Sequence, residues 1–346
     1  MNIKVNETPV RTSRNFLINN IKIDNLELPK NVSKFENVDI SSDKSIVSEN
    51  TNISNLVYGN GDLLEENNLK YCNSKIQLET AKEDVKIVYN FDDKNISLIN
   101  QIEIKADKDS TVYVIYNTKT EKNVFHNGII KSVAKNGAKL NVVVVNFLNE
   151  QSYNFDSFEA IVEEDSKINF FVIDLGGKTS VVNYYSNLIG EKAINNVRGI
   201  YLGKDEEKKD LNIISHLNGK KSVVDIDIQG CLDDKSKKNF KGTIDFKNGC
   251  SGAKGSENEF CLLLSENAKS IALPMLLCTE DDVEGNHSTA CGKVENDSLF
   301  YIMSRGIEYK EAIKLIVKSN FNKILDEIKD EELRNQIIEK IDSRLK

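Results

Sequence analysis

Residues 281–292, DDVEGNHSTACG, combine side chains that could carry chemistry. His287 is one of three histidines in the chain, Cys291 follows it by four residues, and Asp281 and Asp282 lead into the segment. Imidazole and thiolate groups are common metal ligands, and two neighbouring carboxylates can act as general acid and base. Three interpretations are open: a metal site, a catalytic site, or a tight turn that contains a structural histidine.

Spacing limits the metal site that this segment can form. If residues 287–291 are extended, His287 and Cys291 point to one face but lie about 13 Å apart, too far apart to bind one ion. Cys278 is the third candidate ligand, and the flanking glycines disfavour a helix that would shorten these distances. His287 could supply one ligand, with the others coming from elsewhere in the fold or from another chain. The alternative is a structural histidine beside a turn with solvated acids.

The other candidate residues have weaker signals. His216, in IISHLNGK, ends a predicted strand, and His126, in VFHNGII, lies inside a repeat, so both are interpreted as structural. The glycine-rich run 249–258 lacks the lysine–serine pair of a phosphate-binding loop. The sequence also lacks the short motifs of serine hydrolases, nucleotide-binding folds and zinc proteases, so no catalytic residue is assigned.

Short β-strands must position these residues. Three runs with alternating apolar residues start at a constant interval of 28 residues; they begin at Asp109, Gly137 and Asp165. A second apolar series keeps the same interval: Ile102, Ile130 and Phe158. Alternation places one face of each strand inward. Because strands this short cannot bury a face alone, two series at one period favour the stacked coils of a β-solenoid over a β-sandwich.

The chain divides into three regions. Residues 1–85 are polar and are predicted to form a small α/β or irregular N-terminal region, and residues 86–299 the β-helix core. Residues 300–346 form a predicted C-terminal helical domain, with apolar residues at helical spacing and a break near DEEL at 330. An amphipathic helical pair after a solenoid either caps its open end or docks a partner, and the sequence leaves both open.

Composition excludes several classes of protein. The 346 residues are 39% hydrophobic and 29% charged, as in globular proteins, and the net charge of −8 disfavours a nucleic-acid partner. No apolar run approaches the roughly 18 residues of a membrane span, and the N-terminus does not resemble a signal peptide. The six cysteines form no CxxC pair, which indicates reduced thiols. A cytoplasmic location is expected.

The segment from about 216 to 325 resembles the SufB/SufD family of iron–sulfur cluster assembly proteins, and SufD more than SufB. The matching residues follow one another in order: His216, Gly230, Phe240 and Gly242 in FKGTIDF, Leu262 to Ser265, Pro274, Asp282, Val283, His287, and Phe300, Tyr301, Arg305, Gly306 and Ala312 in LFYIMSRGIEYKEA. ETPVRTSRNF (7–16) is similar to the family's Pro-Thr-Arg segment, without its usual tryptophan.

The resemblance implies a mainly β fold, a right-handed parallel β-helix with a C-terminal α-helical domain. It implies a non-catalytic subunit that pairs with SufB through the β-helices and binds SufC, an ABC-type ATPase. A transient iron–sulfur cluster would be shared with SufB, which supplies a cysteine, while His287 supplies a histidine. No cofactor is expected on the isolated chain, which could form a homodimer. The helical tail would dock SufC, through Ser304, Arg305, Gly306, Ile307, Ile313, Ile316 and Val317.

Two departures favour SufD. Ala268 stands where SufB-like chains carry an essential cysteine, and Ser288 follows the histidine in place of an acid. Cys291 replaces a usually apolar residue and is either an additional ligand or a small core residue. Two alternatives remain: a purely structural SufD-like subunit without a metal ligand, and a carbohydrate-active β-helix enzyme. The second is disfavoured because the repeats show no clear ladder of carboxylates and the chain has no tryptophan.

Overall fold

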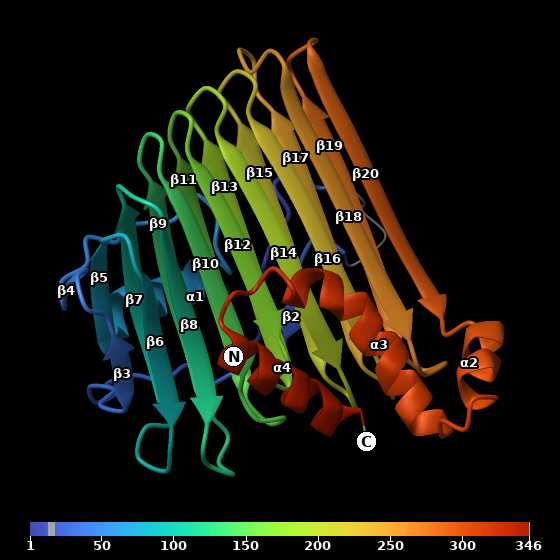
Figure 1. Ribbon diagram of the computed structural model, residues 1–346. Helices are drawn as coiled ribbons and strands as arrows, with labels where there is room; N and C mark the ends of the chain where they lie inside the picture. The colour runs from blue at the N-terminus through green and yellow to red at the C-terminus, as the bar shows by residue number, and fades with distance from the viewer. Residues whose placement is uncertain (13–17, 346) are drawn as a thin grey trace.

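The computed structural model describes residues 1–12 and 18–345, and its centre is a flattened parallel β-solenoid of about eight turns (Figure 1). Each turn contributes one parallel strand to each of two facing sheets, and one antiparallel strand at the N-terminal end brings each sheet to nine strands. The odd-numbered sheet contains β4 (Ile46–Ser48), β5 (Ser74–Thr80), β7 (Ser97–Ala106), β9 (Phe125–Ala134), β11 (Tyr153–Val162), β13 (Thr179–Leu188), β15 (Lys208–Leu217), β17 (Lys237–Phe246) and β19 (Lys269–Cys278). The even-numbered sheet contains β3 (Val38–Ser41), β6 (Asp84–Phe91), β8 (Ser110–Thr118), β10 (Lys139–Phe147), β12 (Lys167–Asp174), β14 (Ile194–Gly203), β16 (Val223–Leu232), β18 (Ala253–Leu263) and β20 (Val283–Lys293).

The predicted solenoid is confirmed, and so is most of its predicted register. Ile102, Ile130 and Phe158 align on neighbouring strands of the odd-numbered sheet. In the even-numbered sheet Leu140 aligns with Ile168, but Leu140 itself aligns with Ser110, an offset of 30 residues instead of 28. The chain between β7 and β8 is two residues shorter than the matching chain between β9 and β10. A two-residue shift leaves every side chain on its predicted face, because side chains alternate with a period of two.

The space between the two sheets is filled by the inward residues of every strand. They form one continuous apolar cluster from Phe35 to Ala268, including stacked Val112, Val142 and Phe170. Parallel strands bury their faces in this way because each coil covers the one before it. Strands β3 and β4 cover the first coil, whereas no strand within the described chain follows β19 and β20 of the last coil.

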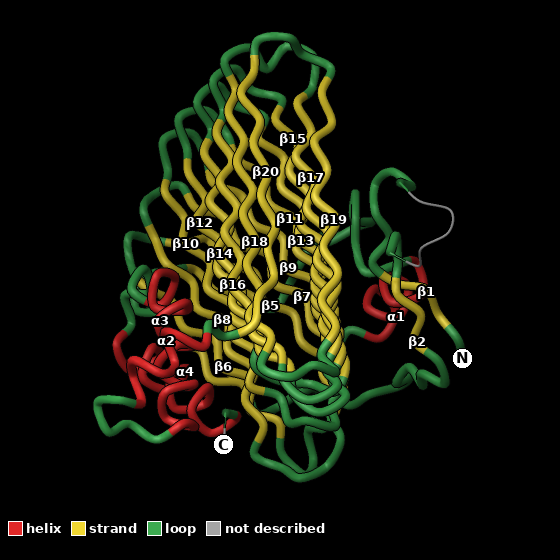
Figure 2. Tube along the Cα trace, turned by 90° about the vertical axis from the view of Figure 1, so that its right-hand side faces the viewer, coloured by secondary structure: helices red, strands yellow, loops and turns green. Residues whose placement is uncertain are grey.

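The N-terminal region covers the outer face of the odd-numbered sheet. β1 (Ile3–Val5) pairs antiparallel with β2 (Ile21–Ile23), and α1 (Asp62–Tyr71) lies beside them, on the side opposite the C-terminal helices (Figure 2). A buried ion pair fixes this region, since Lys241 Nζ lies 2.6 Å from Asp210 Oδ1 and donates to the Asn6 carbonyl. In the predicted family segment 7–16, residues 13–16 lie outside the described residues.

The C-terminal helices are α2 (Asn296–Met303), α3 (Tyr309–Leu325) and α4 (Glu331–Arg344). The predicted break is confirmed: Asp330 caps α4, and its carboxylate accepts a hydrogen bond of 2.9 Å from the Leu333 amide. Helices α3 and α4 run back along the outer face of the even-numbered sheet, in front of β12, β14 and β16 (Figure 1). The sequence left open whether the helices cap the open end of the solenoid or dock a partner. Capping of the open end is wrong for α3 and α4, because they cover the outer face of the even-numbered sheet.

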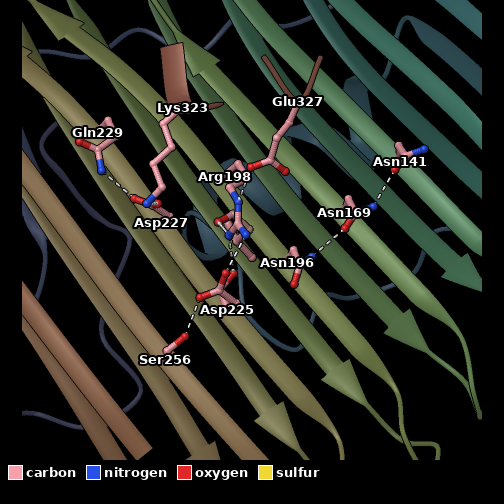
Figure 3. Close-up of polar contacts among 11 residues, drawn as sticks. Asn141, Asn169, Asn196, Arg198, Asp225, Asp227, Gln229, Ser256, Lys323 and Glu327 are labelled. Atoms are coloured by element: carbon pink, nitrogen blue, oxygen red, sulfur yellow. Dashed lines mark hydrogen bonds and ion pairs between the residues drawn. The ribbon is translucent and has the colours of Figure 1, made fainter. Parts of the chain in front are cut away.

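Apolar packing and ion pairs hold these helices on the sheet. Phe321 and Ile324 are buried against outward residues such as Phe171 and Ile200. Figure 3 shows the polar part of this contact, in which Lys323 of α3 and Glu327 of the turn after α3 reach to the sheet. These helices therefore belong to the solenoid's own packing. None of the helices within residues 1–12 and 18–345 is long and apolar enough to cross a membrane.

One arginine connects two strands and the turn that follows helix α3. Arg198 of β14 donates to the Asp225 carboxylate of β16 over 2.6 Å, and to Glu327 over 3.1 Å (Figure 3). Asp225 also accepts a hydrogen bond of 2.5 Å from Ser256 of β18. The chain of contacts thus extends from the helical tail to the strand that lies next to β20.

Candidate functional site

His287 lies on β20, the last strand of the even-numbered sheet, and its side chain is exposed. Its neighbour on β18 is Glu257, so the two side chains lie on the same face of the sheet. That face is the inward one, because Gly285 of the same strand lies against Phe246 and Leu276. His287 thus occupies an inward position that is exposed because no further coil covers it.

Strands β19 and β20 form the open end of the solenoid, visible at the right of Figure 1. Each is the final strand of its sheet, so one side of its backbone has no neighbouring strand within the described chain. Long unpaired edges are templates for pairing with another chain, and monomeric proteins usually cover or shorten them. These edges are 10 and 11 residues long and mostly exposed or half-buried. The open end therefore has the properties of an interface.

Glu257 lies one coil behind His287 and is completely buried. Neither of its carboxylate oxygens has a hydrogen-bond partner among the described residues. Burial, together with the nearby Glu259 carboxylate, raises the pKa of Glu257 to about 8. Gly242 on the facing sheet makes room for it, because a Cβ there would lie 2.2 Å from the Glu257 carboxyl carbon.

A second buried carboxylate on the same strand, that of Glu259, is stabilised by an ion pair and hydrogen bonds. Glu259 accepts hydrogen bonds of 2.7 Å from both Lys238 Nζ and Tyr201 Oη. Lys238 and Glu259 form a buried ion pair, and such a pair is tolerated where its members are hydrogen-bonded. The buried cation Lys238 is therefore already paired with Glu259.

Cys291 is exposed on β20, and it aligns with the buried Cys261 of β18. Four residues separate it from His287 along an extended strand, so the two cannot bind one ion together. Cys278, at the end of β19, is also exposed. Across residues 1–12 and 18–345, no three potential ligands among histidine, cysteine and acidic residues lie close enough to hold a metal ion. A metal at His287 would need further ligands from another chain or from solvent to complete its coordination.

The two acids before His287 lie in the turn that leads into β20. Asp281 and Asp282 are exposed. Asp282 accepts a hydrogen bond of 2.7 Å from the Ser251 hydroxyl, and its carbonyl accepts one from the Gly252 amide. These contacts hold the turn against the preceding coil. They agree with the interpretation of Asp281 and Asp282 as solvated acids of a turn.

The two other histidines lie far from the open end. His126 is fully buried in β9, its ring nitrogens lie within 2.8 Å of the side-chain oxygens of Asn100 and Asn154, and burial lowers its pKa to about 4. His216 is half-buried at the outer end of β15, where Tyr185 Oη lies 3.3 Å from its Nδ1. Burial and the nearby Lys247 lower the pKa of His216. Both positions fit structural roles.

The predicted partner-binding residues of the tail differ in their exposure to solvent. Val317 is fully buried between α3 and the sheet, so its assignment as a partner contact is wrong. Ile313 and Ile316 are half-buried against the same cluster. Ser304, Arg305 and Gly306 are exposed between α2 and α3, where Gly306 takes a φ of 87° that favours glycine, and Ile307 is half-buried.

An exposed apolar surface next to these residues was missed by the sequence analysis as a binding surface. We call it the α2–α3 patch; it comprises Phe300, Tyr301, Met303, Tyr309 and Leu315. The side chain of Phe300 is 75% exposed. Clustered exposed apolar side chains are typical of interaction sites. The available signal was the apolar run LFYIM, which has no polar face of its own.

Comparison with known proteins agrees with this architecture. A family model described as SUF system FeS cluster assembly, SufBD core domain, matches residues 89–320. SufD of Bacillus subtilis is 26% identical over 281 residues, covering 80% of this chain and 63% of that protein. SufD of Escherichia coli is 25% identical, covering 62% of this chain and 50% of that protein.

SufB of Bacillus subtilis is 22% identical, covering 71% of this chain and 53% of that protein. The chain thus spans between 50% and 63% of the length of these curated relatives. The SufD of the same organism is the more similar of the two. The chain belongs to the SufB/SufD family of iron–sulfur cluster assembly proteins and is SufD-like.

Proposed function

We propose that this chain is a non-catalytic scaffold subunit of a SUF complex. It pairs with a SufB-type subunit through the open end of its solenoid and docks a SufC-type ATPase through its helical tail. His287 provides one ligand to an iron–sulfur cluster that is assembled between the two solenoids and then released. The cluster is cargo shared with the partner, and the proposed location is cytoplasmic.

The observation that carries this proposal is the exposed His287 on an inward position of the terminal coil. A SufB-type solenoid that stacks on β19 and β20 would bury their unpaired edges and enclose His287 between the two cores. One imidazole cannot hold a cluster alone, since stable clusters have four protein ligands. A histidine at a shared interface therefore suits transient assembly, with the remaining ligands supplied by the partner.

The α2–α3 patch supports the proposed ATPase contact. Its apolar side chains are exposed on the two helices that flank the exposed loop with Ser304, Arg305 and Gly306. The tail is also fixed to the solenoid through Arg198 and Glu327. A movement imposed on the patch by ATP binding would therefore act on the sheet that ends in β20. Phe300→Ser should weaken capture of the SufC-type partner and leave capture of the SufB-type partner unchanged.

The ligand role is tested by anaerobic cluster assembly in the reconstituted complex. Wild type and His287→Ala are each combined with the SufB-type and SufC-type partners, iron and sulfide, and cluster formation is followed by visible charge-transfer absorption. His287→Ala should form far less cluster while retaining both partners. Asn286→Ala is the matched control, because Asn286 is the exposed neighbour on the opposite face of β20. Undiminished assembly with His287→Ala would favour a purely structural subunit.

A further inference from the structure

Burial of the Glu257 carboxyl group destabilises the isolated chain, because no described residue gives it a compensating hydrogen bond. A buried carboxyl group without hydrogen bonds is unfavourable by several kcal/mol in its charged form, and each such group in a native protein calls for an explanation. Both oxygens of Glu257 are orphaned within the described parts of the chain. Lys238, the interior cation nearby, is already bound to Glu259.

The position of Glu257 beside His287 explains why a buried carboxylate is left unpaired. It aligns with His287 on the adjacent strand, and neighbouring strands lie about 4.8 Å apart. Because both side chains point to the same face, a cation could contact an imidazole nitrogen and a carboxylate oxygen together. Glu257 is buried on the strand next to β20 and, unlike the similarly buried Glu259, has no hydrogen-bond partner among the described residues, whereas Glu284 on β20 is exposed and bound to Lys254.

The facing sheet keeps space for the carboxylate. A side chain at Gly242 would overlap it, since a Cβ there would lie within 2.3 Å of all three carboxyl atoms of Glu257. Gly242 aligns with Pro274 on β19, so the facing strand offers no side-chain hydrogen-bond donor at this level of the open end. The two polar groups at this level are therefore Glu257 and His287.

We propose that Glu257 and His287 form a two-residue binding site for a divalent cation of the iron class at the open end of the solenoid. Imidazole and carboxylate together suit Fe²⁺, Co²⁺ and Zn²⁺. Solvent completes the coordination in the free chain, and the partner subunit does so in the complex. The inference rests on the proposed function, which it deepens: iron is held at His287 by a second residue of this chain before sulfide arrives.

The test is anaerobic titration of the purified full chain with Co²⁺, followed by its visible absorption. Wild type should bind one ion at this site, and Glu257→Gln and His287→Ala should each weaken binding about tenfold or more, comparable to the loss of ligand-supporting groups. Glu284→Gln is the matched control, since Glu284 is an acid of the same strand as His287 on its outward face. It should bind Co²⁺ as wild type does.

Glu257→Gln keeps the size of the side chain and removes an unpaired acid, so it should fold. Glu257→Met serves as a second variant of similar size. If both Glu257 variants bind Co²⁺ like wild type while His287→Ala does not, the role of Glu257 is overturned and that of His287 stands. If wild type binds no Co²⁺, or if binding does not depend on His287, the two-residue site is overturned. Cluster assembly by the complex reports separately on the proposed scaffold function.

Discussion

Gly230 tests the packing of the solenoid interior most sharply. It lies on β16, next to Tyr201 of β14. A Cβ at Gly230 would lie 1.8 Å from Cζ of the Tyr201 ring and 2.2 Å from its hydroxyl oxygen. The ring is fully buried, and its hydroxyl donates to Glu259 over 2.7 Å. Gly230→Ala therefore forces a buried, hydrogen-bonded ring out of its position.

The expected cost has two parts. Overpacking of a well-packed core costs about 1–3 kcal/mol. Loss of the hydrogen bond from Tyr201 to the charged Glu259 adds about 1.5–3 kcal/mol. The sum, about 2.5–6 kcal/mol, is a large share of the ~5–15 kcal/mol that stabilises ordinary domains. Gly230→Ala should therefore lower the urea midpoint by about 1 M or more, at slopes of a few kcal/mol per molar.

Urea unfolding followed by circular dichroism measures this cost. Gly292→Ala is the control, because a Cβ there would meet no atom within 4 Å in the described chain, and its effect should stay within about 0.5 kcal/mol. In a Tyr201→Ala background, Gly230→Ala should cost much less than in wild type, since the clashing ring is gone. Equal midpoints for Gly230→Ala and Gly292→Ala would refute the described register of β14 and β16.

Three further predictions concern the tail, the buried acid and the thiols. Phe321→Ala should remove about 3–5 kcal/mol of tail packing and speed amide exchange in α3 and α4, whereas Leu315→Ala, at a side chain 45% exposed, should not. The folded state binds the Glu257 proton more tightly than the unfolded state, with a pKa near 8 against a usual 4.5. This contribution to the free energy of unfolding is complete below pH 4.5 and is lost as the pH rises to about 8. Over this range it changes the free energy of unfolding by at most ~1.4 kcal/mol per pH unit, and Glu257→Gln should remove this pH dependence. Exposed Cys278 and Cys291 should react promptly with a thiol reagent, while buried Cys231, Cys250 and Cys261 react only on unfolding.

The sequence predicted the solenoid because its inward positions repeat. Ile102, Ile130 and Phe158 kept one spacing, and their alignment is confirmed. The different offset of β8 could not be predicted, since a shift of two residues preserves the alternation of apolar and polar residues. Turn lengths set that offset: residues 107–109 precede β8, whereas the four residues 135–138, with Gly137 at a φ of 76°, precede β10.

The location of the tail required the three-dimensional structure. Ile324 and Val317 marked an apolar helical face, but helical spacing does not say which surface covers it. A signal was present in β10 and β12, whose runs VVVV and FFVI are apolar at consecutive positions. Such runs indicate strands that are buried on both faces, and here the second face lies beneath the tail.

The site was predicted in part. The resemblance singled out His287, and the structure places it at the open end, where its role as a ligand stays a proposal. Glu257, in GSENEF, looks like one of several solvated acids in the sequence. Only the register with β20 and the facing Gly242 distinguish it from Glu259, which is neutralised by Lys238.

Selective labelling of the three histidines tests whether His287 is bound to the cluster. The chain is produced with ¹⁵N-histidine, assembled with unlabelled partners and loaded with cluster, which is reduced and examined by pulsed electron paramagnetic resonance. The account predicts a ¹⁵N coupling of the size expected for a directly bound imidazole, present in His216→Ala and absent in His287→Ala. A cluster that forms without any ¹⁵N coupling, or whose coupling survives in His287→Ala, would contradict it.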